Sequence, residues 1–262
     1  MDLGGSSGRP QRLTRDRQSK CMSLKRFIFA SDLHGDKQDK SAVAALLAAT
    51  ESFKPHHRIF GGDLVDARPL RKGAGSEERA ESMVEDWQKG LNFLNLWRPT
   101  HLLMGNHDVR LYRLAEADKG IESDFAWKGV NELEGRLKKI GCKFLPYHKK
   151  KYFEFGKLRM IHGFFHGVYA SRQMANVYGS VIYGHTHSVD EFSVPGIERR
   201  IARGAGCLCS LDMEYNSHQP NSLRHAHGFV LGVYNQKTGR HWSMQCEEVD
   251  GTWVIPENLK TL

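Results

Sequence analysis

The amino-acid sequence predicts an α/β fold in which two mixed β-sheets pack together and helices cover their outer faces, an αββα sandwich. Two observations indicate it: short apolar runs alternate with helical patterns in the first half of the chain, and short strands follow one another across turns in the second. No linker-like stretch divides residues 22–255 of the 262-residue chain, and 40% of its residues are hydrophobic. We therefore expect a single domain over residues 25–255 with a packed core.

The first half of the chain alternates strands and helices. Apolar runs at residues 26–30, 58–60 and 101–104 are each followed at once by a polar cluster, as is typical of buried strands whose ends carry function. Helical spacing predicts two helices between them, one with Val43, Leu46, Leu47 and Thr50 on one face and one with Ala80, Met83, Val84, Trp87, Leu91 and Leu94. Strand-helix-strand alternation implies right-handed crossovers and mostly parallel strands.

A further helix is expected from about Ser123 to Ile140. Its inward face is expected to hold Phe125, Val130, Leu133 and Leu137. Gly141 follows directly, and a glycine at this position is a common way to end a helix.

After this helix the sequence pattern changes from alternating strands and helices to successive strands. Residues 142–163 are expected to form strands joined by tight turns at Pro146 and Gly156. Residues 228–235 and 241–249 are expected to form a late hairpin. These strands would supply most of the second sheet, which completes the predicted sandwich.

The formal net charge of +8 is unevenly distributed. Residues 1–25 hold six Lys or Arg and two Asp, so half of the excess lies in a segment with almost no hydrophobic residues. We predict a flexible basic tail over residues 1–24 and a C-terminal tail over residues 256–262. The rest of the charge favours acidic substrates such as phosphate esters only weakly. No apolar run approaches the roughly 18 to 20 residues of a membrane helix, so we expect a cytoplasmic protein without a membrane partner.

The five cysteines are odd in number and lack the spacing of a disulfide scaffold or a zinc ribbon. This usage also favours an intracellular protein. Cys207 and Cys209 could share a metal ion. In a strand, however, both thiols would lie on one face, which favours packing in the core.

Five polar motifs follow apolar runs and supply the candidate site. They are SDLHGD, GGDLVD, GNHD, IHG and GHTH, with Asp32, His34, Asp63, Asp66, Asn106, His107, Asp108, His162, His185 and His187. One Asp after a strand is often only a helix cap, but five motifs at strand ends indicate a site, because ligands bind outside those ends. Carboxylate, imidazole and amide ligands suit Mn, Fe, Zn or Co, and this mixture would hold two ions. Residues i and i+2 of an extended segment point the same way, so His185 and His187 could each bind one ion.

The motif order D-x-H, G-D, G-N-H-D, H, G-H-x-H resembles the calcineurin-like metallophosphoesterase family. The resemblance implies two packed mixed sheets flanked by helices, with a binuclear site at one edge. It implies these metal ligands: Asp32, His34 and His187 for one ion, Asn106, His162 and His185 for the other, and Asp63 as the bridge. It also implies that His107 is the general acid or charge stabiliser beside the phosphate and that Asp108 orients it.

The chemistry of phosphate esters agrees with these roles. A phosphate ester anion repels hydroxide, so catalysis needs cations that neutralise its oxygens and generate hydroxide near neutral pH. We therefore predict a phosphoester hydrolase in which a metal-bound hydroxide attacks phosphorus and His107 protonates the leaving group. The cofactor would be two divalent ions, with Mn expected and Fe, Zn, Co or Ni as alternatives.

Differences from the motifs of two branches of this family narrow the class of substrate. The phosphoprotein phosphatase branch has Arg where this chain has Ala67 and Glu where it has Asp108, and the lariat-debranching branch has Cys in place of Asp32. With the basic charge, this favours phosphodiesters of nucleotides or nucleic acids. A phosphomonoesterase for a small metabolite or phosphoprotein is the alternative, and a non-catalytic binding protein is a further one. Asn106 and Arg110 are expected to bind substrate, with a structural salt bridge as the alternative for Arg110.

Some residues outside the motifs have two interpretations. His166 is taken as a loop residue, with substrate contact as the alternative. His225 and His227 precede a strand instead of following one, so they are predicted to lie on the surface. Four aromatic residues could form a base-stacking platform, although such residues more often belong to a core: Phe164, Phe165, Tyr169 and Tyr178. The sequence predicts no oligomeric state.

Overall fold

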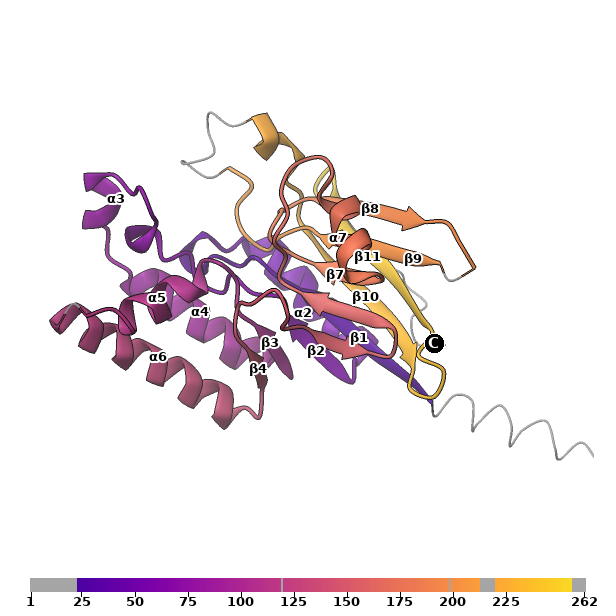
Figure 1. Cartoon of the computed structure of the whole chain (residues 1–262), viewed down its shortest axis with the longest axis horizontal. Helices are drawn as coiled ribbons and strands as arrows, with labels where there is room; N and C mark the ends of the chain where they lie inside the picture. Colours follow the sequence, from indigo (N-terminus) through magenta and orange to yellow (C-terminus); the bar gives the residue numbers. More distant parts are fainter. Residues whose placement is uncertain (1–22, 119, 198, 213–219, 256–262) are drawn as a thin grey trace, which may run out of the picture.

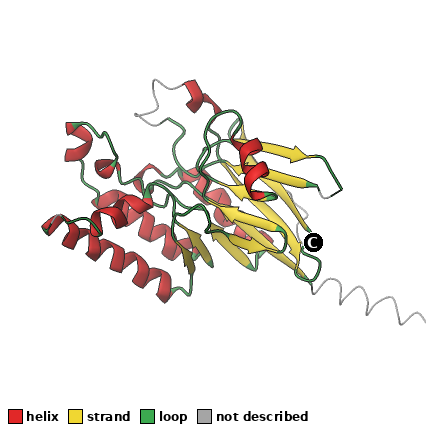
Figure 2. Cartoon of the chain, viewed as in Figure 1, coloured by secondary structure: helices red, strands yellow, loops and turns green. Residues whose placement is uncertain are grey.

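The computed structural model describes residues 23–255 except 119, 198 and 213–219, and it contains two packed β-sheets (Figures 1 and 2). Within these residues the first sheet has the strand order β12 (Thr252–Val254), β11 (His241–Val249), β10 (Gly228–Asn235), β1 (Leu24–Ala30), β2 (His57–Phe60), β3 (His101–Leu103) and β4 (Lys143–Leu145). The second has the order β5 (Phe153–Phe155), β6 (Leu158–Ile161), β7 (Val181–Tyr183), β9 (Arg200–Ala205) and β8 (Val189–Val194). Both sheets are mixed. In the first, β1 to β4 are parallel and β10 to β12 add antiparallel strands on one side. In the second, the parallel strands β6, β7 and β9 lie between the antiparallel edge strands β5 and β8.

Helices cover the outer faces of both sheets. The longer ones are α2 (Lys40–Phe53), α4 (Val84–Trp97), α6 (Ile121–Lys139) and α7 (Ala170–Tyr178). The shorter ones are α3 (Ser76–Ala80), α5 (Asp108–Ala115), η1 (Gly35–Lys37), η2 (Arg68–Leu70) and η4 (Pro220–Arg224). Figure 1 shows α4, α5 and α6 grouped at one end of the molecule, whereas α7 packs on the second sheet. The predicted fold class, two mixed sheets flanked by helices, is confirmed.

Strand β1 shows how one element serves two cores. Phe27 and Phe29 point into the space between the sheets, where they pack with Met160 and Ile182 of the second sheet. Ile28 points to the opposite face and packs beneath the helices. From Phe27 to Ala30 the strand is fully buried on both faces and has no polar position, which explains the uninterrupted apolar run over these residues.

The predicted tails, residues 1–24 and 256–262, lie outside the described residues except for Ser23 and Leu24. β1 already begins at Leu24, one residue inside the predicted N-terminal tail. The single domain over residues 25–255 stays a prediction.

The helix predicted over residues 80–94 is two helices, so the prediction of a continuous one is wrong. α3 ends at residue 80, where Glu81 takes an extended conformation and its carboxylate forms a 2.8 Å ion pair with Arg68. The hydroxyl of Ser82 then accepts a hydrogen bond of 3.2 Å from the backbone N–H of Val84, the first residue of α4. Val84 is consequently exposed instead of inward.

The helix predicted from Ser123 to Ile140 is confirmed as α6, but one residue of its inward face is not. The apolar residues buried on α6 are Ala126, Val130, Leu133 and Leu137. Phe125 is 70% exposed, because it lies about 100° around the helix from Ala126. The prediction that Phe125 faces the core is therefore wrong.

Pro146 does not close a tight turn, contrary to the prediction. Strands β4 and β5 lie at edges of different sheets, so residues 146–152 cross from the first sheet to the second. Gly156, with a φ of 66°, does close the turn between β5 and β6, and β10 and β11 form the predicted hairpin. Short apolar runs report that a strand is buried but not which strand pairs with it, which is why the crossing was missed.

Two histidines lie between the sheets at the amino ends of β2 and β3. The rings of His57 and His101 are 5.4 Å apart and pack against Phe155. Burial lowers the pKa of both histidines to about 4. An unfolded chain protonates its histidines near pH 6.5, so it takes up these protons first as the pH falls. The stability from keeping this pair neutral is complete above about pH 6.5 and is lost between about pH 6.5 and 4.

We expect the double variant His57→Gln, His101→Gln to lose less stability in acid than the wild type. The fall in the free energy of unfolding between pH 7 and pH 4 should shrink by on the order of 2 kcal/mol, allowing for partial solvent screening. Urea unfolding across this range measures it. His148→Gln, in an exposed turn, is the matched control and should follow the wild type. An unchanged pH dependence in the double variant would contradict the assignment.

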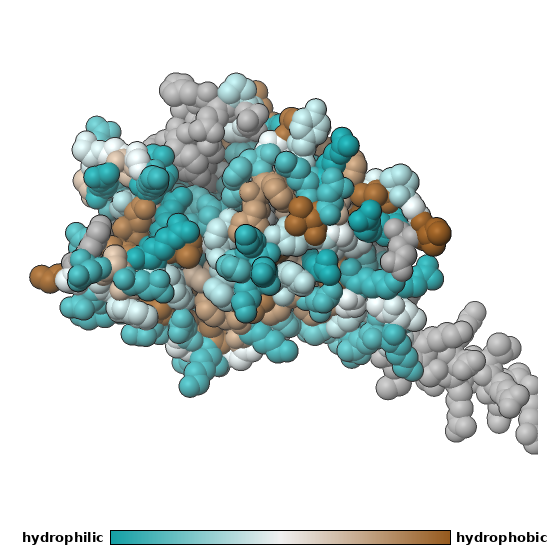
Figure 3. Space-filling view, viewed as in Figure 1, coloured by the Kyte–Doolittle hydropathy of each residue, from teal (hydrophilic) through white to brown (hydrophobic). Residues whose placement is uncertain are grey.

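Exposed apolar side chains are scattered over the described surface, among them Ile121 and Phe125 on α6 and Trp242 on β11. On the face drawn in Figure 3, the hydrophobic patches are small and separated by hydrophilic residues. Single exposed apolar residues of this kind are normal and do not by themselves mark an interface. Within the described residues, we find no helix with the length and apolar character needed to span a membrane.

Candidate metal centre

The carboxyl ends of five strands bring the predicted ligands together. β1, β2 and β3 are parallel neighbours in the first sheet, and β6 and β7 in the second, so the loops after them meet at one edge. The side chains that meet there are Asp32, His34, Asp63, Asn106, His162, His185 and His187. All are buried except Asn106 and His185, which are half-buried. The structure thus places the predicted ligand residues in one cluster.

One group within this cluster is centred on His34 and His187. Their Nε2 atoms are 3.1 Å apart, and Nε2 of His187 is 3.5 Å from Oδ1 of Asp32. Oδ2 of Asp63 lies 3.9 Å from Nε2 of His34. Two carboxylates and two imidazoles therefore converge, a donor set that suits Mn, Fe, Zn or Co.

A second group shares Asp63 with the first. Ligand atoms of Asp63, His162 and His185 all lie within 4.8 Å of one another. Nε2 of His162 is 3.3 Å from Oδ2 of Asp63 and 3.0 Å from Oδ1 of Asn106. Because Asp63 belongs to both groups, its position is that of a carboxylate that can bridge two ions.

The outer ring nitrogen of His162 has a hydrogen-bond partner of its own. Nδ1 of His162 lies 2.9 Å from the backbone oxygen of Gly61. An acceptor at Nδ1 places the proton there and leaves the lone pair on Nε2, which is the nitrogen that faces the cluster. The side chain of His162 is therefore oriented as a ligand. Nδ1 of His34 lies 3.4 Å from Oδ1 of Asp66, which is an ion-pair distance without a hydrogen bond.

The electrostatics of the cluster favour a cation. Burial would lower the pKa of His162, but chiefly Asp63 raises it to about 9, and Asp32 likewise raises the pKa of His187 to about 9 against burial. The pKa of Asp32 falls to about 2 despite burial, because it bonds to His187. Histidines must be neutral to bind an ion, so protons and metal ions compete for these sites. The donor set and its charge fit a pair of divalent ions.

Two buried carboxylates hold the loop after β2 in place by accepting hydrogen bonds from its backbone amides. Asp108 accepts hydrogen bonds of 2.8 to 3.2 Å from four N–H groups, those of Asp63, Leu64, Val65 and Gly105. Asp86 of α4 accepts the next two, from Asp66 and Ala67, at 3.0 and 2.7 Å. Two buried carboxylates thus bind five consecutive amides, residues 63–67, and thereby fix the backbone that carries Asp63.

This placement overturns the predicted role of Asp108 as the residue that orients His107. Both oxygens of Asp108 are engaged by backbone amides. The carboxylate that contacts His107 is Asp66, whose Oδ1 lies 2.7 Å from Nδ1. Burial would lower the pKa of His107, but Asp63 and Asp66 raise it above its ordinary value. The second Asp of GGDLVD, three residues after Asp63, was the sequence signal for this partner.

Two arginines brace the same loop. Arg68 forms ion pairs with Asp36 at 2.8 Å, Asp66 at 3.1 Å and Glu81 at 2.8 Å. Nη1 of Arg110 donates to the backbone oxygen of Asp66 at 2.9 Å, so this side chain contributes to positioning the loop. Substrate binding by Arg110 and Asn106 stays a prediction.

The ligand loops have a strained backbone and close contacts. Five predicted ligands have a positive φ, between 51° and 71°: Asp32, His34, Asp63, His185 and His187. For residues with a side chain this conformation costs of the order of 1 to 3 kcal/mol, and such strain is concentrated at functional sites. Gly105 and Gly184 permit the approach of the loops, since a Cβ on either would lie 1.9 Å from Oδ1 of Asp63 or 2.5 Å from Oδ2 of Asp32.

The connection between β9 and β10 also contacts the cluster, which the sequence did not predict. Cys207 and Cys209 follow β9 instead of lying in a strand, so that part of the prediction is wrong, and both are fully buried. The prediction that His225 and His227 lie on the surface is also wrong, since both are half-buried. His225 has its ring centroid 4.9 Å from that of His187. These contacts join segments far apart in the chain, and no local pattern signals them.

His166 contacts the cluster, whereas the four aromatic residues of the predicted stacking platform lie in different surroundings. Nδ1 of His166, on an exposed loop, lies 2.9 Å from Nε2 of His185, so it contacts a predicted ligand. Among the aromatic residues, Tyr178 is buried in the core and Tyr169 is exposed. Phe164 stacks on Tyr147 at 4.6 Å. The four aromatic residues therefore do not form one stacking platform.

Comparisons with known proteins agree with the predicted family. The family model for calcineurin-like phosphoesterases matches residues 25–189, a range that contains the predicted ligands. A search of curated proteins found no match.

Several solved structures are similar to this chain. An archaeal phosphodiesterase is 13% identical and covers 84% of this chain and 99% of its own, with a TM-score of 0.41. Vacuolar Protein Sorting 29 from Cryptosporidium parvum is 15% identical and covers 88% and 95%, with a TM-score of 0.47. Yfce, a phosphoesterase from E. coli, is 16% identical and covers 84% and 97%, with a TM-score of 0.35. Similarity at this level says nothing about substrate.

Proposed function

The chain belongs to the calcineurin-like phosphoesterase family, and from this premise we propose that it is a metal-dependent phosphodiesterase acting on nucleotide or nucleic-acid phosphate esters. As a family member it is a phosphate-ester hydrolase with His and Asp clusters that can bind metal ions. The diester preference rests on one observation, the engagement of Arg68 by three carboxylates.

We assign the ligands in two sets that share one carboxylate. The first set is Asp32, His34, Asp63 and His187, and the second is Asp63, Asn106, His162 and His185. Two divalent ions would neutralise the phosphate oxygens and activate the attacking water. Oxygen and imidazole donors without a thiolate in the set favour Mn, with Fe, Zn, Co or Ni as alternatives.

His107 is assigned as the group that protonates the leaving oxygen. Its Nδ1 is held by Asp66, and its Nε2 lies 3.9 Å from Oδ2 of Asp63, so Nε2 faces the shared carboxylate. Neighbouring carboxylates keep the pKa of His107 above its ordinary value, which favours the protonated form that a general acid needs.

The engagement of Arg68 favours diesters through charge. A phosphomonoester carries up to two negative charges at neutral pH, whereas a diester carries one. The guanidinium nearest the motif position of the phosphoprotein phosphatase arginine is already paired with Asp36, Asp66 and Glu81. The site therefore has less positive side-chain charge available for a second phosphate charge, and the net charge of +8 favours polyanionic substrates in general.

The test compares two model substrates after metal is removed from the purified protein and Mn is restored. Hydrolysis of bis-p-nitrophenyl phosphate should require Mn and exceed that of p-nitrophenyl phosphate in kcat/KM. Preference for the monoester would instead indicate a phosphomonoesterase. Binding of two ions with no hydrolysis of either substrate, or of DNA, RNA or cyclic nucleotides, would point to a non-catalytic binding protein.

A further inference from the structure

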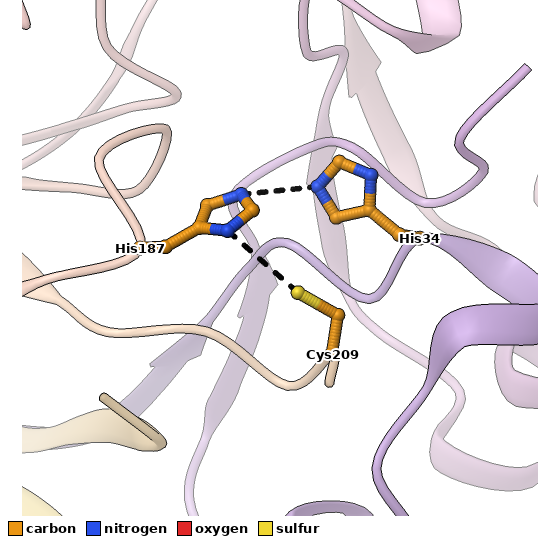
Figure 4. Close-up of side chains that lie close together, drawn as sticks. All are labelled: His34, His187 and Cys209. Carbon is orange, nitrogen blue, oxygen red and sulfur yellow. Dashed lines mark hydrogen bonds between the residues drawn. The ribbon is translucent and has the colours of Figure 1, made fainter. Parts of the chain in front are cut away.

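We propose that Cys209 is a positioning residue for the metal ligand His187, and that its thiol makes the ion held by Asp32, His34 and His187 the more weakly bound of the two. The inference rests on the metal centre of the proposed function. Figure 4 shows the arrangement, in which one ring nitrogen of His187 faces His34 and the other faces Cys209. Nε2 of His187 faces Nε2 of His34 at 3.1 Å, and its Nδ1 faces Sγ of Cys209 at 3.8 Å.

The hydrogen bond between His187 and Cys209 has one possible direction once an ion is bound to His187. An ion on Nε2 of His187 uses the lone pair of that nitrogen, so the neutral ring carries its proton on Nδ1. The Nδ1–H group then donates to Sγ of Cys209. The sulfur therefore occupies the place that a carboxylate or carbonyl takes behind most metal-binding histidines.

The position of the thiol is fixed by the surrounding backbone. Cys209 forms an antiparallel bridge with Gln38, four residues after His34. The backbone N–H of Leu208 donates to the oxygen of Asp32 at 3.1 Å, so the segment is tied directly to a ligand loop. The backbone oxygen of Cys209 lies 3.0 Å from Nε2 of His227. These contacts fix the backbone from which the side chain projects, and the side chain itself is fully buried among neighbouring atoms.

The consequence for metal binding follows from the strength of the acceptor. Sulfur accepts hydrogen bonds weakly, so it leaves less electron density on Nε2 of His187 than a strong acceptor would. In the second ligand set, His162 has the backbone oxygen of Gly61 behind it at 2.9 Å, which is a stronger acceptor. We therefore expect two binding affinities, with the weaker one at the Asp32, His34 and His187 set.

The experiment is a calorimetric titration of Mn²⁺ into the metal-free full chain. Cys209→Ala should weaken one of the two binding events by about tenfold and leave the other unchanged, because it removes the partner of one ligand only. Cys209→Ser replaces the sulfur with an oxygen that accepts hydrogen bonds more strongly, so that affinity should equal or exceed the wild-type value, the usual sign of a positioning role. It also serves as the second variant if Cys209→Ala does not fold.

Cys207 provides a matched control. Its thiol is also fully buried and two residues away, and it lies 3.6 Å from the backbone oxygens of Cys209 and Ala226. It packs against Cys209, but within the described residues it makes no hydrogen bond to a predicted ligand. Cys207→Ala should therefore keep both affinities. Equal losses in Cys207→Ala and Cys209→Ala, or no loss in Cys209→Ala, would overturn the proposal while leaving the metal centre in place.

A second measurement distinguishes a hydrogen bond from His187 to the sulfur of Cys209 from direct binding of that sulfur to the ion. With Co²⁺ in place of Mn²⁺, a thiolate bound to the ion gives a near-ultraviolet charge-transfer band. We expect no such band in the wild type. A band that disappears in Cys209→Ser would show that the sulfur is itself a ligand and would overturn the proposal. A wild type that binds no divalent ion would instead overturn the proposed function.

Discussion

We expect His107→Ala to lower turnover of a dinucleotide by about 100- to 10,000-fold without loss of bound metal ions. The expected loss is large because bound cations would neutralise the phosphate but would leave the departure of an alkoxide as the remaining barrier. His107 is held by Asp66 at Nδ1 and presents Nε2 towards the cluster. None of the assigned ligand sets includes this side chain, so its removal should not affect metal content.

The leaving group makes the test specific. p-Nitrophenolate departs without a proton, so His107→Ala should cost only about tenfold or less on bis-p-nitrophenyl phosphate. The measurements are kcat on both substrates and metal content by elemental analysis. His148→Ala, in an exposed turn, is the matched histidine control and should behave as the wild type. Equal losses on the two substrates would remove His107 as the general acid and leave it a charge stabiliser.

The sequence indicated which residues gather in the candidate site, because each one follows an apolar run within a short motif. Asp32 and His34 after β1, and His185 and His187 after β7, need only the local strand-loop pattern to be recognised. Parallel strand order then brings the loops to one edge, which the alternation of strands and helices also indicates.

The partners of these ligands were not predictable in the same way. Asp86 lies on α4, twenty residues from the amide of Asp66 that it binds, in a helix whose start was itself misplaced. Cys209 meets His187 through a connection between strands, twenty-two residues away. Local patterns carry no information on such contacts, because they depend on how separate segments fold back onto the site.

Asp108 illustrates the difference between what a local motif predicts and what depends on contacts between distant segments. Its motif was recognised, and its place beside the site was expected, but its role depends on backbone amides of residues 63–65, which the motif does not contain. In the structure, its carboxylate accepts the amides of Asp63, Leu64 and Val65. A hydrogen bond from a buried amide to a charged group is among the stronger interactions in a protein, and each unpaired amide is costly.

Asp108→Ala should therefore destabilise the protein by on the order of 3 to 5 kcal/mol, because it leaves several buried amides without an acceptor. It should also weaken metal binding, since the released loop carries Asp63. Urea unfolding of the metal-free protein and a Mn²⁺ titration measure the two effects. Asp86→Ala, which removes the acceptor of only two amides, should cost less stability and is the matched control.

Asp108→Asn separates this scaffold role from the predicted role in orienting His107. An amide side chain keeps the size of the carboxylate but turns one acceptor into a donor, which faces an N–H group of the loop. A scaffold role therefore predicts loss of stability and of metal affinity, with turnover falling as a consequence. A variant with normal stability and normal metal content but slow turnover would contradict the scaffold role. It would mean that Asp108 acts through His107 during the reaction, in spite of the amides that engage it here.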